Sequence, residues 1–181
     1  MQPLPTVGRH SFPPPPERGG FSERRMRLWL LAVGQRMPNW VDEAYADYAK
    51  RLPPEMPLQL KEIRAEARRS SISSDAAMER EAVRIDAAIP PGCRLVVLDE
   101  YGQRLTTTAL AAEMQRWRQD GRDVALLIGG ADGLAPRIKQ RADMLLRLSD
   151  FTLPHGLARV LLAEQLYRAQ SVLVGHPYHR A

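Results

Sequence analysis

From Met26 onward, short β-prone runs alternate regularly with longer stretches of helical periodicity. This alternation is typical of α/β domains, in which a helix connects each strand to a parallel neighbour. We therefore expect one α/β domain with a mainly parallel sheet flanked by helices. The expected strands cover residues 28–33, 58–63, 94–98, 124–128 and 144–148.

The connecting segments predict helices with recognisable ends. One begins at Pro38 and ends at Pro53, since proline suits a first helical turn and cannot continue a helix. Ser74 or Asp75 can cap the next helix, which runs to about residue 88, and Thr106 to Thr108 can cap one that reaches residue 118. A short helix is expected at 136–142 and a long one from about 157 to 173. The side chains expected to share a face are Trp40, Ala44, Tyr48 and Leu52 in the first helix and Leu157, Val160 and Leu161 in the last.

Residues 1–25 differ in composition from the rest of the chain. They hold six of the fifteen prolines and no repeated apolar pattern, which predicts disorder. Two interpretations remain, a flexible arm or residues upstream of the natural start, and we favour the second. The expected organisation is a disordered extension over 1–25 and a single domain over 26–181.

Composition says more about the cellular compartment of the protein than about any reaction that it catalyses. Cys93 is the only cysteine and the chain has four histidines, so neither a disulfide nor a structural zinc site is expected. No apolar run approaches the length of a membrane helix. These features favour a cytoplasmic protein without a metal. A net charge of +5 agrees with an anionic partner, but a charge of this size also suits an ordinary solvated surface.

Three loops that follow predicted strands are candidates for a binding site, because open α/β sheets bind ligands at the carboxyl ends of their strands. They cover residues 98–102, 128–133 and 148–156. The glycines at 129, 130 and 133 allow close approach of a flat ligand or make only a tight turn, and their spacing matches neither a dinucleotide fingerprint nor a P-loop. In the last loop, Phe151, Leu153 and Pro154 lie beside Ser149 and Thr152. This mixture suits an adenine ring, or packing under a neighbouring helix.

The C-terminal region offers candidate substrate contacts. Glu164 precedes Arg168 by four residues, which is usually a surface ion pair, but apolar neighbours also allow a substrate contact. His176, Tyr178, His179 and Arg180 crowd the last six positions. Such a tail either frays or contacts RNA, with rings stacking on a base and arginine holding a phosphate.

The chain from Met26 to Arg180 resembles the RlmH family, bacterial SPOUT enzymes that methylate N3 of a pseudouridine in large-subunit ribosomal RNA. The resemblance rests on Ala32-Val33-Gly34, Met37-Pro38-Asn39-Trp40, Asp120-Gly121-Arg122-Asp123-Val124, Leu126-Leu127-Ile128-Gly129-Gly130, Thr152-Leu153-Pro154-His155 and His176-Pro177-Tyr178-His179-Arg180.

The resemblance implies a C-terminal deep trefoil knot, whereas periodicity alone predicts an unknotted flavodoxin-like or Rossmann-like sandwich. It also implies a homodimer with the active site at the subunit interface, and S-adenosyl-L-methionine as cofactor. By position, the cofactor-binding residues are Leu98, Gly130, Ser149, Asp150, Phe151, Thr152, Leu153 and Pro154. Gly156 departs from a member of this family in which proline follows the histidine.

For catalysis we expect the tail and the last helix to contact the substrate through Glu164, Tyr178, His179 and Arg180. His179 is a candidate proton acceptor and Arg180 a candidate anion stabiliser, while His155 and Glu164 leave the identity of the base open. Two alternatives remain, a non-catalytic ribosome-binding protein and a SPOUT methyltransferase acting on tRNA.

Overall fold

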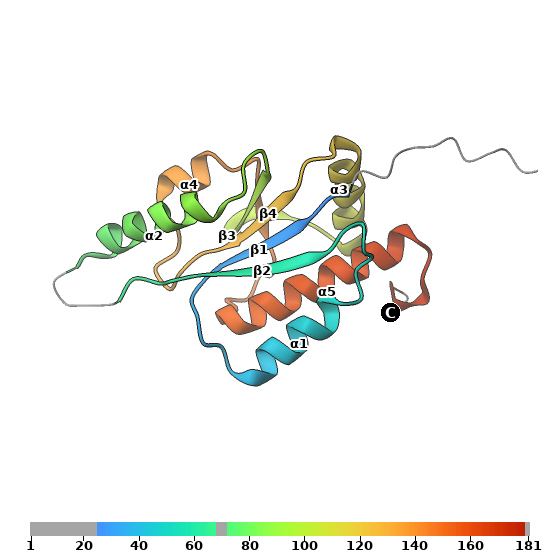
Figure 1. The fold of residues 1–181 in the computed structure, drawn as a ribbon, viewed down its shortest axis with the longest axis horizontal. Helices are drawn as coiled ribbons and strands as arrows, with labels where there is room; N and C mark the ends of the chain where they lie inside the picture. Colours follow the sequence, from blue (N-terminus) through green and yellow to red (C-terminus); the bar gives the residue numbers. More distant parts are fainter. Residues whose placement is uncertain (1–24, 68–71, 180–181) are drawn as a thin grey trace, which may run out of the picture.

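A computed structural model describes residues 25–67 and 72–179, and within them five strands form one parallel sheet between two layers of helices (Figure 1). The strand order is β2-β1-β4-β3-β5. The strands are β1 (Leu28–Val33), β2 (Leu58–Ile63), β3 (Arg94–Arg104), β4 (Val124–Ile128) and β5 (Met144–Arg147). The helices are α1 (Asn39–Ala49), α2 (Ser74–Ala88), α3 (Thr107–Asp120), α4 (Pro136–Gln140) and α5 (His155–Leu173), followed by the 3-10 turn η1 (Pro177–His179).

The predicted fold class, a mainly parallel α/β sheet flanked by helices, is confirmed. The strand order differs from both unaided expectations, because β4 lies between β1 and β3, whereas flavodoxin-like and Rossmann-like sheets run 2-1-3-4-5 and 3-2-1-4-5-6. Periodicity detects strands but carries no signal for which strands are neighbours.

Alternate residues of the central strands face two separate cores. In β1, Leu30 packs towards α1, α3 and α5, whereas Leu31 packs towards α2 and α4. All five residues of β4 are buried, as expected for a strand covered on both faces. The carboxyl ends of β3, β4 and β5 therefore lie at one edge of a rigid sheet.

The predicted bounds of β1, β2 and β4 are confirmed, while β3 is longer than the expected 94–98. β3 pairs with β5 up to Leu98, leaves the ladder, and resumes pairing at Gln103 opposite the same residue, Leu146. The predicted end at Leu98 was wrong, since a bulge interrupts the strand there and the strand then continues to Arg104.

The two predicted helix faces were only partly correct. In the first, Trp40 is half exposed and Val41 and Tyr45 are buried instead, whereas Tyr48 packs against the core and Leu52 is buried as predicted. In α5 Leu157 is 44% exposed, while Ala158 and Leu162 are buried. In the first turns of both helices the buried face is shifted by one residue, a rotation of about 100° that short apolar runs do not resolve.

The predicted caps were partly correct. Thr106 caps α3 by accepting a hydrogen bond from the amide of Ala109 at 3.1 Å, which confirms that prediction. Ser73, and not Ser74 or Asp75, caps α2 by accepting from the amide of Ala76 at 3.2 Å. Among the described helices, none is long and apolar enough to cross a membrane.

Candidate functional site

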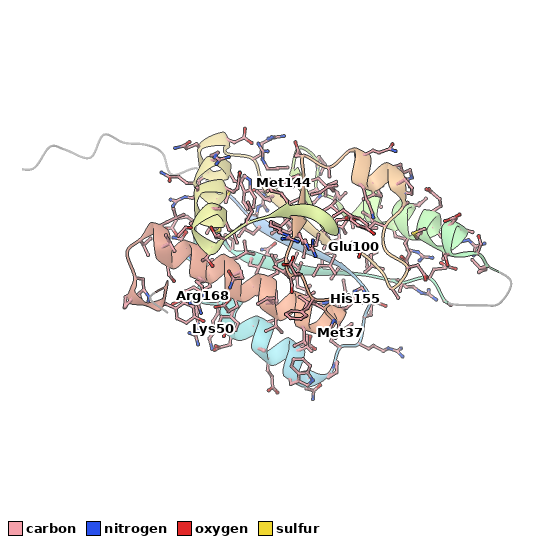
Figure 2. The ribbon with its side chains drawn as sticks, turned by 180° about the vertical axis from the view of Figure 1, so that it is seen from behind. Met37, Lys50, Glu100, Met144, His155 and Arg168 are labelled. Carbon is pink, nitrogen blue, oxygen red and sulfur yellow. The ribbon has the colours of Figure 1, made fainter. Side chains whose placement is uncertain are left out.

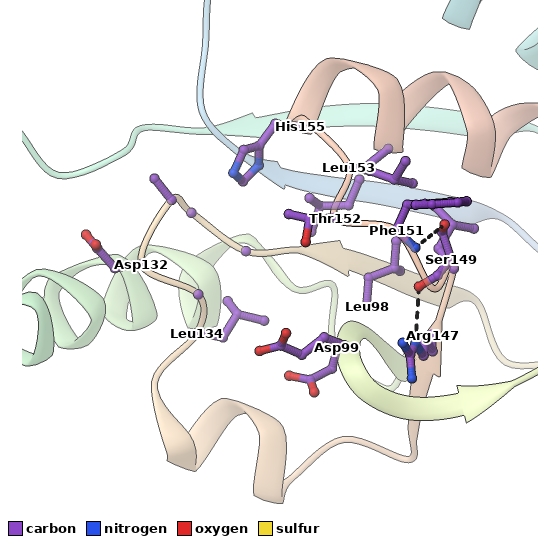
Figure 3. Close-up of a pocket in the computed structure, with 18 of the residues that line it drawn as sticks. Leu98, Asp99, Asp132, Leu134, Arg147, Ser149, Phe151, Thr152, Leu153 and His155 are labelled. Carbon is purple, nitrogen blue, oxygen red and sulfur yellow. Dashed lines mark hydrogen bonds between the residues drawn. The ribbon is translucent and has the colours of Figure 1, made fainter.

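The three loops selected from the sequence converge on one cavity of about 510 Å³ at the carboxyl ends of β3, β4 and β5 (Figure 3). Leu98, Gly130 and the segment 149–153 all line it. Pro154 is the residue that precedes α5 and is not among the lining residues. The volume lies within the usual range for cofactor-sized ligands.

The first wall comes from the bulge in β3, which carries Asp99 and Glu100 to the cavity. Gly102 crosses directly over β5, since a Cβ atom there would lie 2.6 Å from the carbonyl carbon of Leu146. Without this close crossing the bulge could not return to the sheet.

Asp99 is the most enclosed acid of this wall, with its side chain 7% exposed and a carboxylate oxygen 2.6 Å from Nζ of Lys139. Burial by itself would raise the pKa of Asp99, but hydrogen bonds from Lys139 and from the amide of Tyr101 bring the pKa below its ordinary value. This wall therefore holds an ion pair between Asp99 and Lys139 at neutral pH. Sequence reasoning missed both residues, although Asp99 directly follows a predicted strand.

The second wall is the glycine turn after β4. The amide of Gly133 donates to the carbonyl of Gly130 at 3.0 Å, and Gly133 has a φ of +89°. The turn is therefore tight, and it also lines the cavity, while close approach of a flat ligand stays a prediction. Behind Gly130 lies the buried carboxylate of Glu81 from α2, 2.6 Å from where a Cβ atom of residue 130 would be.

The third wall is the segment after β5. Ser149 Oγ accepts a hydrogen bond from the amide of Phe151 at 2.9 Å, which folds the segment into a turn. Oδ1 of Asp150 forms ion pairs with Nε of Arg104 and with Nε of Arg147, each at 3.1 Å. Phe151 lines the pocket but is 84% exposed, and the other apolar lining residues include Leu98, Leu148 and Leu153.

His155 begins α5 at the rim of the cavity (Figure 3). Its Nδ1 atom is buried and has no hydrogen-bond partner among the described residues. Burial and the positive charge of Arg159 lower the pKa of His155, against a smaller opposing effect of Glu81. The imidazole is therefore neutral at pH 7 and able to accept a proton or a hydrogen bond.

Glu164, at the middle of α5, and Tyr178, in the turn η1 that follows the helix, lie together. Oε1 of Glu164 accepts from Nε of Arg168 at 2.7 Å and from the Tyr178 hydroxyl at 3.2 Å. Burial and the neighbouring Tyr48 and Glu164 raise the pKa of Tyr178 to about 12. The side chain of His179 and all of Arg180 lie outside the described residues.

This C-terminal cluster is separated from the cavity within one chain. Arg168 follows His155 by thirteen positions on α5, which corresponds to roughly 20 Å along the helix. Figure 2 shows the two side chains well apart along this helix. The structure therefore brings together the expected cofactor residues in one group and Glu164 with Tyr178 in another.

The described residues contain no group of three or more metal-binding side chains. The chemistry available in the pocket comes from backbone groups, the Asp99–Lys139 pair, Arg147 and a neutral imidazole.

Comparison with known proteins gives consistent matches. A family model described as "Predicted SPOUT methyltransferase" matches residues 26–179. The chain is 57% identical over 155 residues to the ribosomal RNA large subunit methyltransferase H of Ralstonia nicotianae, covering 86% of this chain and 99% of the relative. It is 58% identical over 155 residues to the protein of the same name from Laribacter hongkongensis, with the same coverage of each chain.

Among solved structures, a probable methylase family protein from Haemophilus influenzae superposes with a TM-score of 0.52 at 14% sequence identity. The match covers 85% of this chain and 70% of that protein. At this level of identity it supports the fold alone.

Proposed function

The chain belongs to the SPOUT methyltransferase family, and on this premise we propose that it transfers a methyl group from S-adenosyl-L-methionine to N3 of a pseudouridine in 23S ribosomal RNA. The observation that carries the proposal is the convergence of Leu98, Gly130 and residues 149–153 on one cavity. The names of the relatives support the RNA class, and the RlmH resemblance supplies the acceptor base.

The pocket fits the proposed cofactor. Leu98, Leu148 and Leu153 offer an apolar surface to an adenine ring. Gly130 has no side chain, so its backbone groups stay accessible to a ligand. Bound there, the sulfonium would supply an already activated methyl group. The protein then has to align the acceptor, exclude water and manage one proton.

Proton transfer is the step that needs a side chain. N3 of a pseudouridine is a weak acid that is protonated at neutral pH, so a base or a stabiliser of the imide anion lowers the barrier. We propose that the Glu164–Tyr178 cluster and the residues after it contact the substrate. In this proposal His179 is the proton acceptor and Arg180 stabilises the anion. His155 remains a second candidate base, since it lies at the pocket and is neutral.

We propose a homodimer with a composite active site. The cavity lies at the start of α5, whereas Tyr178 follows the end of this helix and contacts Glu164 at its middle, so a second copy is the direct way to bring a tail to a pocket. α5 also carries partly exposed apolar side chains that a partner would cover. These are Leu157, Val160 and Leu161.

We also propose the C-terminal trefoil knot, within a single domain over 26–181. β5 pairs with β3 at the edge of the sheet, yet α5 packs against both α1 and α3. The connecting segment lines the cavity together with the loops after β3 and β4, as expected if the chain passes between them. Stretching a single molecule from both ends tests this, because a knotted chain stops short of full contour length and an unknotted chain reaches it.

The decisive test of function is methyl transfer to defined acceptors. Purified protein is incubated with methyl-labelled S-adenosyl-L-methionine and with whole ribosomes, large subunits, free 23S RNA or tRNA from cells lacking this modification. We expect label on a pseudouridine of 23S RNA in at least one ribosomal sample, mapped by nuclease digestion and mass spectrometry. Label only on tRNA would support the tRNA alternative, and no uptake of the cofactor would leave a ribosome-binding protein. A cytoplasmic location follows from this substrate.

The role of the tail is tested by Arg180→Ala. If Arg180 stabilises the acceptor anion, the variant loses methyl transfer while its affinity for S-adenosyl-L-methionine changes little. Turnover and calorimetric titration measure the two quantities. An equal loss of both would reject the role.

A further inference from the structure

Glu81 is a buried acid that the proposed reaction does not use. It lies on α2, is only 7% exposed, and does not line the cavity itself. Among the described residues, no lysine, arginine or histidine nitrogen lies within ion-pair distance of it, unlike Asp99. Burying a carboxylate destabilises the folded state unless ion pairs or hydrogen bonds compensate for the lost water. The position of Glu81 therefore calls for an explanation.

The carboxylate of Glu81 joins two segments that are far apart in the sequence. Oε1 accepts a hydrogen bond from the amide of Glu66, in the segment after β2, at 2.8 Å. Oε2 lies against Gly130, 2.6 Å from the place of a Cβ atom, and the carboxyl carbon lies 3.2 Å from that place. Glu81 therefore fills the space behind the glycine turn that forms the second wall of the pocket.

This contact explains why residue 130 is glycine. Gly130 does not have a positive φ, unlike Gly133, so its backbone conformation would accept alanine. The obstacle is the Glu81 side chain, which is packed and hydrogen-bonded and cannot swing freely into solvent. Gly130 and Glu81 are thus sterically matched to each other.

We propose that Glu81 is a positioning residue of the methyl-donor site, holding the 129–133 turn in the shape that binds the cofactor. This inference rests on the proposed function and adds a residue on α2 that no strand-end loop contains. The property that matters is the shape and hydrogen-bonding capacity of the side chain. Its charge is not required, because Oε1 of glutamine can also accept from the amide of Glu66.

The first experiment compares Glu81→Ala with Glu81→Gln by calorimetric titration with S-adenosyl-L-methionine and with S-adenosylhomocysteine. Alanine should weaken both ligands at least about fivefold, since it leaves the turn unsupported and the Glu66 amide without its partner. Glutamine should stay within about twofold of the wild type, because packing and hydrogen bond are retained. Glu79→Ala removes an exposed carboxylate of the same helix and should leave both affinities unchanged.

The second experiment is a double-mutant cycle with Gly130→Ala. Alone, this substitution should weaken ligand binding about tenfold because the new methyl group displaces Glu81. Combined with Glu81→Ala, it should cost less than the product of the two single losses, since the methyl group enters space that the carboxylate has left. Thermal unfolding of every variant is recorded, so that a loss of affinity is separated from a loss of fold.

Three results would overturn the proposal: unchanged affinity in Glu81→Ala, the same loss in Glu81→Gln as in Glu81→Ala, or strictly multiplicative losses in the cycle. The wild type serves as the separate test of the function itself. If it binds neither ligand, the proposed function fails, and the role of Glu81 fails with it. If the wild type binds and the variants behave like it, only the role of Glu81 is lost.

Discussion

At the scale of single residues, Gly102 controls the shape of the first pocket wall. A Cβ atom at this position would lie 2.6 Å from the carbonyl carbon and 2.7 Å from the nitrogen of Leu146, and these backbone atoms are held in β5. Gly102→Ala should therefore cost about 1–3 kcal/mol of unfolding free energy in urea titrations. It should also weaken cofactor binding, because Asp99 and Glu100 lie on the same bulge.

Gly92→Ala is the matched control for Gly102→Ala. Gly92 has a φ of +74° and nothing within 4 Å of its would-be Cβ atom, so alanine there strains only a turn before β3. We expect it to lose stability without losing cofactor affinity. Equal affinity losses in the two variants would mean that the close crossing does not shape the pocket.

His155 predicts a pH dependence of stability. Since folding lowers the pKa of His155, the unfolded chain binds this proton more readily than the folded chain. The stability contributed by the neutral imidazole is then present above about pH 6.5, the value for an unfolded histidine, and is lost as the pH falls below it. His155→Gln should flatten the fall in melting temperature between about pH 7 and 5. An NMR titration giving His155 an ordinary or raised pKa would contradict this.

At the scale of elements, the Thr106 cap should affect α3 and leave the pocket unchanged. Thr106→Ala removes the acceptor for the Ala109 amide and should cost about 1 kcal/mol of unfolding free energy, whereas Thr106→Ser should retain most of it. Neither variant should alter the affinity for S-adenosyl-L-methionine. A change in affinity would show that α3 is coupled to the cofactor site.

The ends of elements were easier to predict than their faces. Thr106 was found because a side-chain cap acts over three residues, and Pro38 because proline acts on its own turn. The expected helix end at Pro53 was too late, since α1 already ends at Ala49. The exposure of Trp40 and Leu157 was not found, because a helix face is defined by what packs against it. The bulge in β3 was missed for the same reason, since β5 lies about forty residues further along the chain.

At the scale of the whole molecule, the proposed composite site predicts complementation between two inactive variants. Gly130→Leu disables a pocket, because its side chain would displace Glu81 from behind the 129–133 turn, and Arg180→Ala disables a tail. If each active site combines the pocket of one copy with the tail of the other, dimers co-expressed from both variants should recover up to about a quarter of wild-type activity. This is because half of the dimers are mixed and each has one intact site.

The control for complementation is each variant expressed alone with the same pair of affinity tags. Activity of the mixture no higher than that of the single variants would rule out a site shared between copies. Activity that recovers although the protein sediments as a monomer would do the same.

Local sequence patterns were enough to predict the strands, the helices and the loops that line the pocket, although not the bulge in β3. Strand-end position and composition singled out residues near 98, 130 and 149–153, because parallel strands carry their carboxyl ends to one edge and local residue types report loops. The RlmH resemblance added the expected cofactor and the expected acceptor base.

The folded chain was needed to reveal the strand order, the bulge that brings Asp99 to Lys139, and the placement of Glu81 behind Gly130. It also separated the Glu164–Tyr178 cluster from the cavity along α5. Each of these is a contact between segments distant in the chain. Residue types and periodicity carry information over a few positions, whereas such contacts depend on how the whole sheet and its helices pack.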